Sequence, residues 1–229
     1  MLAHAAFAGG FRPWLWYDDP MALVPVKLSD AVPPTPPQAA ALIADAQTRI
    51  EAFIESRLAN PVSSFVPSNF PLVYGALRQV ADANLSPGPL FCEWGSGAGV
   101  VTCLAAMAGF DACGIEFEAD LVALSERLAA DHRLKVSFYR GNLVPYGGQR
   151  IAERVGDFEW LAVGGDDPYE QMGLDINDFD MVFAYPWPGE QRVIERLFDR
   201  FAADGALLMT YNGAEGISLF RRRSARPRR

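Results

Sequence analysis

The chain has 229 residues, of which 50% are hydrophobic and 21% are charged. This length suits one large domain, or one domain with an appendage, and it is sufficient to bury a sizeable core. The apolar fraction is too high for a disordered chain. No uncharged apolar run approaches the ~20 residues that a membrane-spanning helix needs, so we expect no membrane span.

The charge is unevenly distributed along the chain. Lys and Arg number 20 against 28 Asp and Glu, which gives a net charge of −8. Six of the basic residues are arginines of the segment 221–229, so residues 1–220 carry 14 basic and 28 acidic side chains, a net charge of −14. An acidic body repels polyanions, which makes general nucleic-acid binding unlikely. We interpret the basic tail 221–229 as a solvated end, with binding to an anionic partner as the alternative.

The cysteines and the first residues of the chain indicate whether to expect a metal site and in which cellular compartment the protein is expected. Cys92, Cys103 and Cys113 match no zinc spacing and form no disulfide framework, so the sequence predicts buried thiols and no metal site. The segment from Met1 to Ala5 lacks the basic region of a secretory signal. We therefore expect a cytoplasmic protein.

The first third of the chain is predicted to precede the main domain. Residues 1–36 are expected to be irregular, with an aromatic cluster at 14–17 and a proline-rich linker at 33–37. Residues 37–86 are expected to form a helical cover. One helix begins near Thr35 and carries apolar residues at helical spacing between 43 and 58. Ser68 is the predicted N-cap of the next helix, and Pro87-Gly88-Pro89 marks a break.

Residues 87–220 alternate between short apolar strands and amphipathic helices. This alternation predicts an α/β fold with a doubly wound, mostly parallel, Rossmann-like sheet that has helices on both faces. The predicted strands are 90–94, 112–116, 136–139, 181–185 and 206–210, and the predicted helices are 100–107, 119–131 and 190–203.

Two segments depart from this rhythm. An insertion, 144–177, separates the third and fourth strands and contains a candidate strand at 158–163. Such loops lie at the carboxyl ends of strands, where ligands bind. Residues 217–220 form one more candidate strand after the fifth. A complete antiparallel pair at that edge would need help from the insertion, and an edge left exposed could instead be covered in an oligomer.

A glycine-rich turn, Glu93-Trp94-Gly95-Ser96-Gly97-Ala98-Gly99, joins the first predicted strand to the helix after it. Glycines here permit positive φ and let a ligand approach the backbone closely. The dinucleotide fingerprint G-x-G-x-x-G fails, because Val100 or Thr102 falls at its third glycine. A second acid, Glu116, ends the next strand, at a position that suits the two hydroxyls of a ribose.

This stretch resembles the first motif of the class I S-adenosylmethionine-dependent methyltransferases. The resemblance implies that S-adenosyl-L-methionine is the cofactor and that the turn with Gly95, Ser96, Gly97 and Gly99 wraps its methionine part. It also implies that Glu93 contacts the amino group, directly or through water. Asn142 follows the third strand, where the family commonly has an acid that holds the adenine amine; the alternative is a plain turn-forming Asn.

The fourth predicted strand leads into Tyr185-Pro186-Trp187-Pro188, which resembles the family's fourth motif, the one facing the transferred methyl group. Methyltransferases that act on planar amines often begin this motif with Asn or Asp, which is missing here. The prolines still fix a rigid backbone with a free carbonyl, and the aromatic rings could form a cage for a cationic amine. The alternative is a rigid, hydrophobic strand-to-helix turn.

An amine must lose its proton before it attacks a methyl group, so we considered proton acceptors. A His base is not expected, because His4 lies near the chain end and His132 ends a surface helix. The candidates are the Tyr185 hydroxyl, the Pro186 carbonyl and the pair Asp166-Asp167, which can also be read as a solvated turn.

The segment Phe65-Val66-Pro67-Ser68 adds a finer resemblance, to small protein-lysine methyltransferases similar to the mitochondrial ATP-synthase c-subunit lysine methyltransferase. There such a segment leads into a helix over the cofactor, which implies cofactor contacts for Phe65 and Ser68. As structure alone, Phe65 can be core.

We therefore predict a methyltransferase that acts on an amine, with a protein lysine as the first acceptor and a small metabolite as the second. The alternatives are a non-catalytic cofactor-binding module of the same fold and a nicotinamide-dependent oxidoreductase.

Overall fold

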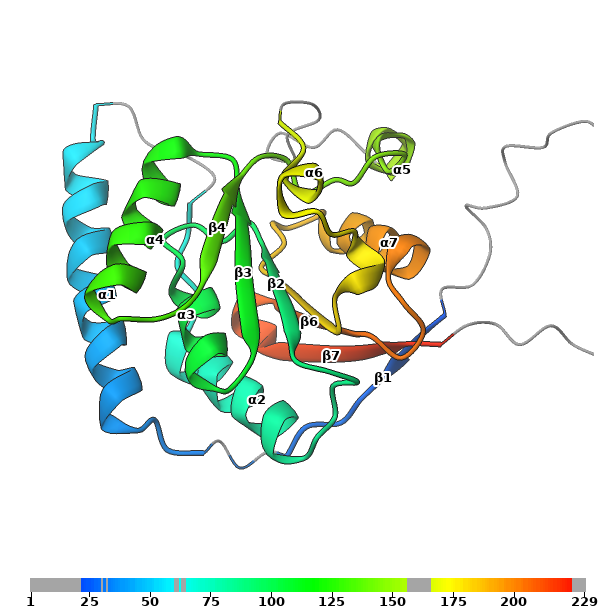
Figure 1. Ribbon diagram of the computed structural model, residues 1–229, viewed down its shortest axis with the longest axis horizontal. Coiled ribbons are helices and arrows are strands. Elements are labelled where there is room, and N and C mark those ends of the chain that lie inside the picture. Colours follow the sequence, from blue (N-terminus) through cyan, green and yellow to red (C-terminus); the bar gives the residue numbers. More distant parts are fainter. Residues whose placement is uncertain are drawn as a thin grey trace, which may run out of the picture.

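The computed structural model describes residues 22–29, 31, 33–59, 62, 65–155 and 166–223. These residues form a 7-stranded sheet of order β1-β7-β6-β5-β2-β3-β4 (Figure 1). The strands are β1 (Leu23–Pro25), β2 (Leu90–Trp94), β3 (Asp111–Glu116), β4 (Ser137–Arg140), β5 (Met181–Ala184), β6 (Leu207–Tyr211) and β7 (Ile217–Arg222). The helices are α1 (Pro37–Ser56), α2 (Phe70–Asp82), α3 (Val100–Met107), α4 (Ala119–Asp131), α5 (Gln149–Val155), α6 (Pro168–Met172) and α7 (Gln191–Phe201), with 3-10 turns η1 (Ile176–Asp178) and η2 (Gly213–Glu215).

The five strands from β2 to β6 all run parallel to one another. Strand β7 pairs antiparallel with β6. Side chains of β5 alternate between two cores: Met181 and Phe183 face one, and Val182 and Ala184 face the other. Helices α1 to α4 cover the first face and α5 to α7 the second (Figure 1). The prediction of a doubly wound, mostly parallel, Rossmann-like sheet is confirmed.

The edge of the sheet beyond β6 differs from the prediction. Strand β1 pairs antiparallel with β7, and Val24 lies opposite Arg221. The segment 1–36, expected to be irregular, therefore supplies the strand that completes the antiparallel edge, and no described residue of the insertion takes part in it. The edge of β7 offers unpaired backbone groups, and β1 satisfies them. The aromatic cluster at 14–17 and the candidate strand at 158–163 lie outside the described residues.

The first part of the predicted basic tail belongs to the sheet. Arg221 and Arg222 end β7, and their guanidinium groups donate hydrogen bonds to backbone carbonyls. Arg221 binds the carbonyl oxygens of Gly205 at 2.9 Å and Leu85 at 2.7 Å. The expectation that the chain leaves the fold at residue 221 is wrong, because these side chains hold the end of β7 against two loops and against Asp199 of α7.

Helices α1 and α2 form the predicted helical cover. The N-cap of α2 is Asn69, whose side chain accepts a hydrogen bond from the Leu72 amide at 3.1 Å, and not Ser68 as predicted. Because Pro71 has no N–H to offer, the Leu72 amide is the donor within reach of the cap. Ser68 is thereby free to line the site described below.

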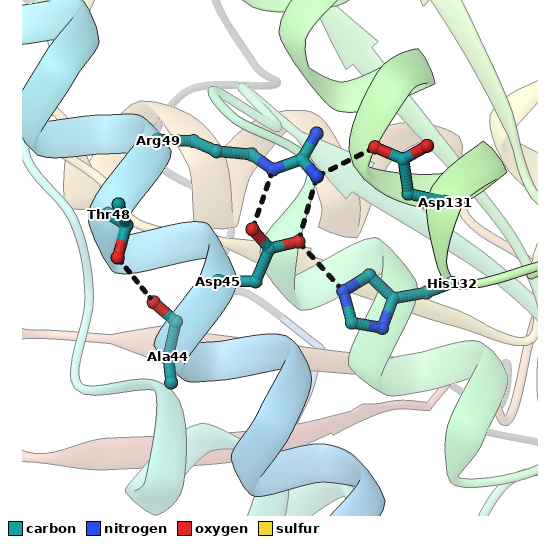
Figure 2. Close-up of polar contacts among 6 residues, drawn as sticks. All are labelled: Ala44, Asp45, Thr48, Arg49, Asp131 and His132. Atoms are coloured by element: carbon teal, nitrogen blue, oxygen red, sulfur yellow. Dashed lines mark hydrogen bonds and ion pairs between the residues drawn. The ribbon is translucent and has the colours of Figure 1, made fainter.

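A polar cluster ties α1 to the end of α4 (Figure 2). Arg49 pairs with Asp45 at 2.9 Å and with Asp131 at 2.7 Å, and Asp45 also contacts the His132 ring at 2.9 Å. His132 is the C-cap of α4 and contacts the Asp45 carboxylate from that helix end. The cluster fixes α1 across the face of the sheet on which the glycine turn lies.

The described part of the insertion packs under α7. Ala152, Tyr169 and Ile176 are buried in the same core as α7, and the Tyr169 hydroxyl donates to the Leu143 carbonyl at 2.7 Å. These residues complete the second face of the sheet. None of the described helices is long and apolar enough to cross a membrane.

Candidate functional site

A cavity of about 710 Å³ opens at the carboxyl ends of β2, β3 and β5. This volume lies within the roughly 300–1,000 Å³ typical of small-molecule sites, and the position is where open α/β sheets bind ligands. Eleven of the twelve residues predicted for the site line it: Phe65, Ser68, Glu93, Gly95, Ser96, Gly97, Glu116, Asn142, Tyr185, Pro186 and Trp187.

The glycine turn forms the floor of this cavity. Gly95 and Gly97 have φ values of 72° and 52°, which residues with a side chain rarely adopt. The amides of Gly95 and Ser96 both donate to the Ile115 carbonyl, each at 2.9 Å, and so hold the turn against β3. The Ser96 hydroxyl is buried and has no hydrogen-bond partner among the described residues. A Cβ on Gly114 would lie 2.8 Å from the Ser96 Oγ, so this hydroxyl packs against β3.

Glu93 is the penultimate residue of β2 and is buried, 4% exposed. Its Oε2 accepts hydrogen bonds from the Thr102 amide at 2.8 Å and the Thr102 hydroxyl at 2.6 Å. Burial raises the pKa of Glu93 to about 8; the two Thr102 bonds oppose this shift, and the nearby charge of Glu116 adds to it. The Glu93 carboxyl is thus largely protonated at neutral pH until a cation arrives beside it.

Glu116 is the last residue of the neighbouring strand β3 and is 9% exposed. Its two oxygens accept hydrogen bonds from the Gly97 amide at 2.7 Å and the Glu118 amide at 2.9 Å. Burial raises the pKa of Glu116, and the backbone amides oppose that shift. A carboxylate has about four lone-pair sites, so Glu93 and Glu116 both retain acceptor capacity for a ligand.

Gly99 is the predicted site residue that does not line the cavity. It is the N-cap of α3 with a φ of 74°. A Cβ there would lie 2.4 Å from the Ser125 Cβ and 2.6 Å from the Phe138 Cζ. The prediction that Gly99 binds cofactor is therefore corrected: this glycine lets the start of α3 pack closely against α4 and β4.

Asn142 lines the cavity, but its side chain also builds the local turn. Its Oδ1 accepts a hydrogen bond from the Val144 amide at 2.9 Å. Of the two interpretations, turn formation describes the contact in the structure. The Nδ2 group and the second lone pair of Oδ1 are what this amide offers to a ligand.

Phe65 covers the glycine turn from the opposite side. A Cβ on Gly97 would lie 2.7 Å from the Phe65 Cε2, so the ring rests directly on that glycine. Phe65 also packs edge-to-face on Phe53 of α1, with ring centroids 6.1 Å apart, and the Arg57 guanidinium lies 5.6 Å from the centre of the Phe53 ring. The segment 65–69 and the end of α1 thus form one wall of the cavity.

The other end of the cavity is aromatic. Tyr185 packs edge-to-face on Tyr211 at 4.7 Å between ring centroids, and burial, followed by the nearby Tyr211, raises the pKa of Tyr185. Asp166 and Asp167, predicted as alternative proton acceptors, do not line the cavity. Asp167 instead caps α6 by accepting hydrogen bonds from the Tyr169 and Glu170 amides.

Sequence reasoning missed two acids of the cavity lining, Glu118 and Glu190. Glu190 lies beside Trp187 and is 7% exposed. An acid directly after a Pro-Gly pair, at the start of a helix, is an ordinary pattern, and nothing in the sequence marks Glu190 as buried. Thr102, the partner of Glu93, was also missed, because a Thr in the first turn of a helix has no distinctive pattern.

No protein-family model matches the chain, and no curated protein matches it. Among solved structures, it is similar to an RNA methyltransferase from Salinibacter ruber in complex with S-adenosyl-L-homocysteine. The identity is 19% over 72% of this chain and 98% of that chain, with a TM-score of 0.49. A methyltransferase from Geobacter sulfurreducens has 19% identity over 85% and 92% of the two chains, with a TM-score of 0.47. An O-methyltransferase from Bacillus cereus in complex with SAH has 13% identity over 80% and 69%, also with a TM-score of 0.47.

These similarities concern the fold, which the order and direction of the strands define independently. The chemistry of the site follows from its own residues. Two buried acids on adjacent strands and a glycine turn between them suit a ligand that carries an ammonium group and a ribose.

Proposed function

We propose that this protein binds S-adenosyl-L-methionine in the cavity and transfers its methyl group to an amine. The observation that supports this proposal most is the placement of Glu93 and Glu116. They are buried at the carboxyl ends of the neighbouring parallel strands β2 and β3 and flank the glycine turn on one cavity. That cavity continues to Tyr185 and Trp187, where the acceptor would lie.

Each part of the cofactor has a matching group. Glu93 would hold the ammonium of the methionine part, and Glu116 would hold the ribose hydroxyls. Phe65 would exclude water from the glycine turn, and Ser68 and Asn142 complete the wall. When bound, S-adenosylmethionine supplies a methyl group on a cationic sulfur. Transfer is an in-line displacement, to which the chain contributes positioning and desolvation.

We further propose an amine acceptor, with a protein lysine side chain ahead of a small metabolite. Tyr185 and Trp187 line the cavity beyond the glycine turn, and aromatic rings attract alkylammonium groups. Incubation of cell lysate with methyl-labelled cofactor separates the two acceptors. Label in protein supports a lysine, and label in small molecules supports a metabolite. A non-catalytic module would bind the cofactor and transfer no label.

Calorimetry on Glu116→Ala tests the cofactor site. If Glu116 holds the ribose, removing the carboxylate should weaken S-adenosylmethionine binding by about 1–3 kcal/mol. Glu126→Ala, at an exposed position of α4, is the matched control and should bind as the unaltered protein does. A folded Glu116→Ala protein with unchanged affinity would remove the ribose assignment.

A further inference from the structure

Glu190 immediately precedes α7, next to the aromatic end of the cavity. Its carbonyl accepts hydrogen bonds from the Val193 and Ile194 amides at 2.9 and 3.1 Å, and its own amide donates to the Trp187 carbonyl at 2.9 Å. Pro188 and Gly189, the latter with a φ of 96°, occupy the two central positions of this turn. Proline followed by a glycine with positive φ is the signature of a type II turn, so the backbone fixes Glu190 beside Trp187.

The Glu190 carboxyl is buried and only half satisfied. Its Oε2 accepts a hydrogen bond from the Trp187 amide at 3.2 Å. Its Oε1 is also buried and has no hydrogen-bond partner in the described part of the chain. Burial raises the pKa of Glu190, and the Trp187 amide opposes that shift. Since a buried carboxyl oxygen without a partner is unfavourable, a ligand that brings a donor there gains binding energy.

The other groups considered as proton acceptors are less suited to the task. The raised pKa of Tyr185 keeps its hydroxyl neutral at pH 7, so it is a poor acceptor of a proton. Asp167 caps α6 away from the cavity, and His132 is paired with Asp45 on the outer side of α4. Among the described residues, Glu190 carries the carboxyl group that lies at the aromatic end of the cavity.

The charge of the cavity also favours a cation. Its described lining contains four carboxyl groups, those of Glu93, Glu116, Glu118 and Glu190. Its one described guanidinium, that of Arg57, is ion-paired with Asp120. A phosphate-bearing acceptor such as RNA would therefore meet repulsion, whereas an alkylammonium group would be attracted.

We propose that Glu190 is a catalytic residue that binds the ammonium form of a primary alkylamine and accepts its proton; this inference rests on the proposed function. One proton passes from the ammonium nitrogen to the carboxylate and leaves a neutral amine. The nitrogen lone pair then forms a bond to the methyl carbon while the carbon–sulfur bond breaks, with its electrons staying on sulfur. The products are a methylammonium group and a neutral thioether, and Glu190 later releases the proton to water.

Binding of n-butylammonium, which reproduces the end of a lysine side chain, tests the proposal without turnover. Isotope-labelled protein is saturated with S-adenosylhomocysteine and titrated by NMR as the unaltered protein, Glu190→Gln and Glu195→Gln. Glu195 lies on the same helix, outside the cavity lining, and is the matched control. Glutamine keeps an acceptor for the Trp187 amide but carries no charge.

We expect Glu190→Gln to weaken n-butylammonium binding at least tenfold, with Glu195→Gln unchanged and S-adenosylhomocysteine affinity equal in all three proteins. Equal amine binding by Glu190→Gln, no amine binding by the unaltered protein, or equal binding of butan-1-ol would overturn the role of Glu190 alone. No S-adenosylhomocysteine binding by the unaltered protein would overturn the proposed function and this inference with it. Nα-acetyl-lysine N-methylamide, titrated in parallel, separates the sources: binding as tight as n-butylammonium indicates a protein lysine, and weaker binding a small amine.

Discussion

The raised pKa of Glu93 makes a quantitative prediction about stability. A carboxyl group whose pKa rises from 4.5 to about 8 on folding binds more protons in the native state than in the unfolded state between those two values. Its contribution to stability is therefore fully present below pH 4.5 and is lost as pH rises towards 8. Glu93→Gln, a neutral and nearly isosteric change that keeps an acceptor for the Thr102 amide, should remove this loss.

The magnitude follows from the shift. One pKa unit corresponds to about 1.4 kcal/mol, and linkage over the window from pH 5.5 to 7.5 gives a loss of about 2–3 kcal/mol attributable to Glu93. The two pH values both lie above the sequence pI of about 4.8, so the protein has a negative net charge at each of them. The free energy of unfolding of Glu93→Gln minus that of the unaltered protein should therefore increase by that amount when the pH is raised from 5.5 to 7.5.

Urea unfolding of both proteins at the two pH values measures this double difference, in which the titrating groups that do not interact with Glu93 cancel. Glu126→Gln, at an exposed position of α4, should follow the unaltered protein. A Glu93→Gln protein whose stability changes with pH as much as that of the unaltered protein would refute the reasoning. Glu93 would then be ionised at neutral pH, and its environment less desolvated than its burial implies.

Three further predictions follow from the same contacts. Because a cationic amino group should ionise Glu93, binding of S-adenosylmethionine at pH 7 should release close to one proton. Calorimetry measures this release as a dependence of the binding enthalpy on the ionisation enthalpy of the buffer. If the binding enthalpy is the same in all buffers, Glu93 does not bind the ammonium group. Gly97→Ala should displace the Phe65 ring and strain a backbone φ of 52°. We expect a loss of about 1–2 kcal/mol in the free energy of urea unfolding and at least a tenfold loss of cofactor affinity. Unchanged affinity would show that the Phe65 ring does not cover the ligand. Arg49→Ala should lower the free energy of unfolding by less than about 1 kcal/mol, because the ion pair with Asp131 is partly exposed. In 1 M NaCl this difference should become smaller. A loss above about 2 kcal/mol that does not depend on salt would contradict this.

The core of the fold was predictable because its signals are local. β2 and β5 are short apolar runs bounded by turns, and α3 begins directly after a glycine turn, so pattern and structure coincide. β1 carries no such signal. Its three residues become a strand only because β7, almost two hundred residues later, leaves an edge to pair with.

The candidate site was predictable in the same uneven way. Glu93, Gly97 and Glu116 lie where the motif places them, because the carboxyl ends of parallel strands meet at one edge of a sheet. Gly99 shares the motif but serves packing, a difference that depends on Ser125 and Phe138 of other elements. Glu190 resembles an ordinary residue at the start of a surface helix, and only the three-dimensional turn reveals its burial.

Calorimetric titration of the unaltered protein with S-adenosylhomocysteine, and separately with NAD⁺, tests the central claim most directly. We predict one bound S-adenosylhomocysteine per chain with a Kd on the order of tens of micromolar or tighter, and no heat from NAD⁺. Binding of NAD⁺ in place of S-adenosylhomocysteine, or binding of neither, would contradict the assignment of Glu93, Glu116 and the glycine turn to this cofactor.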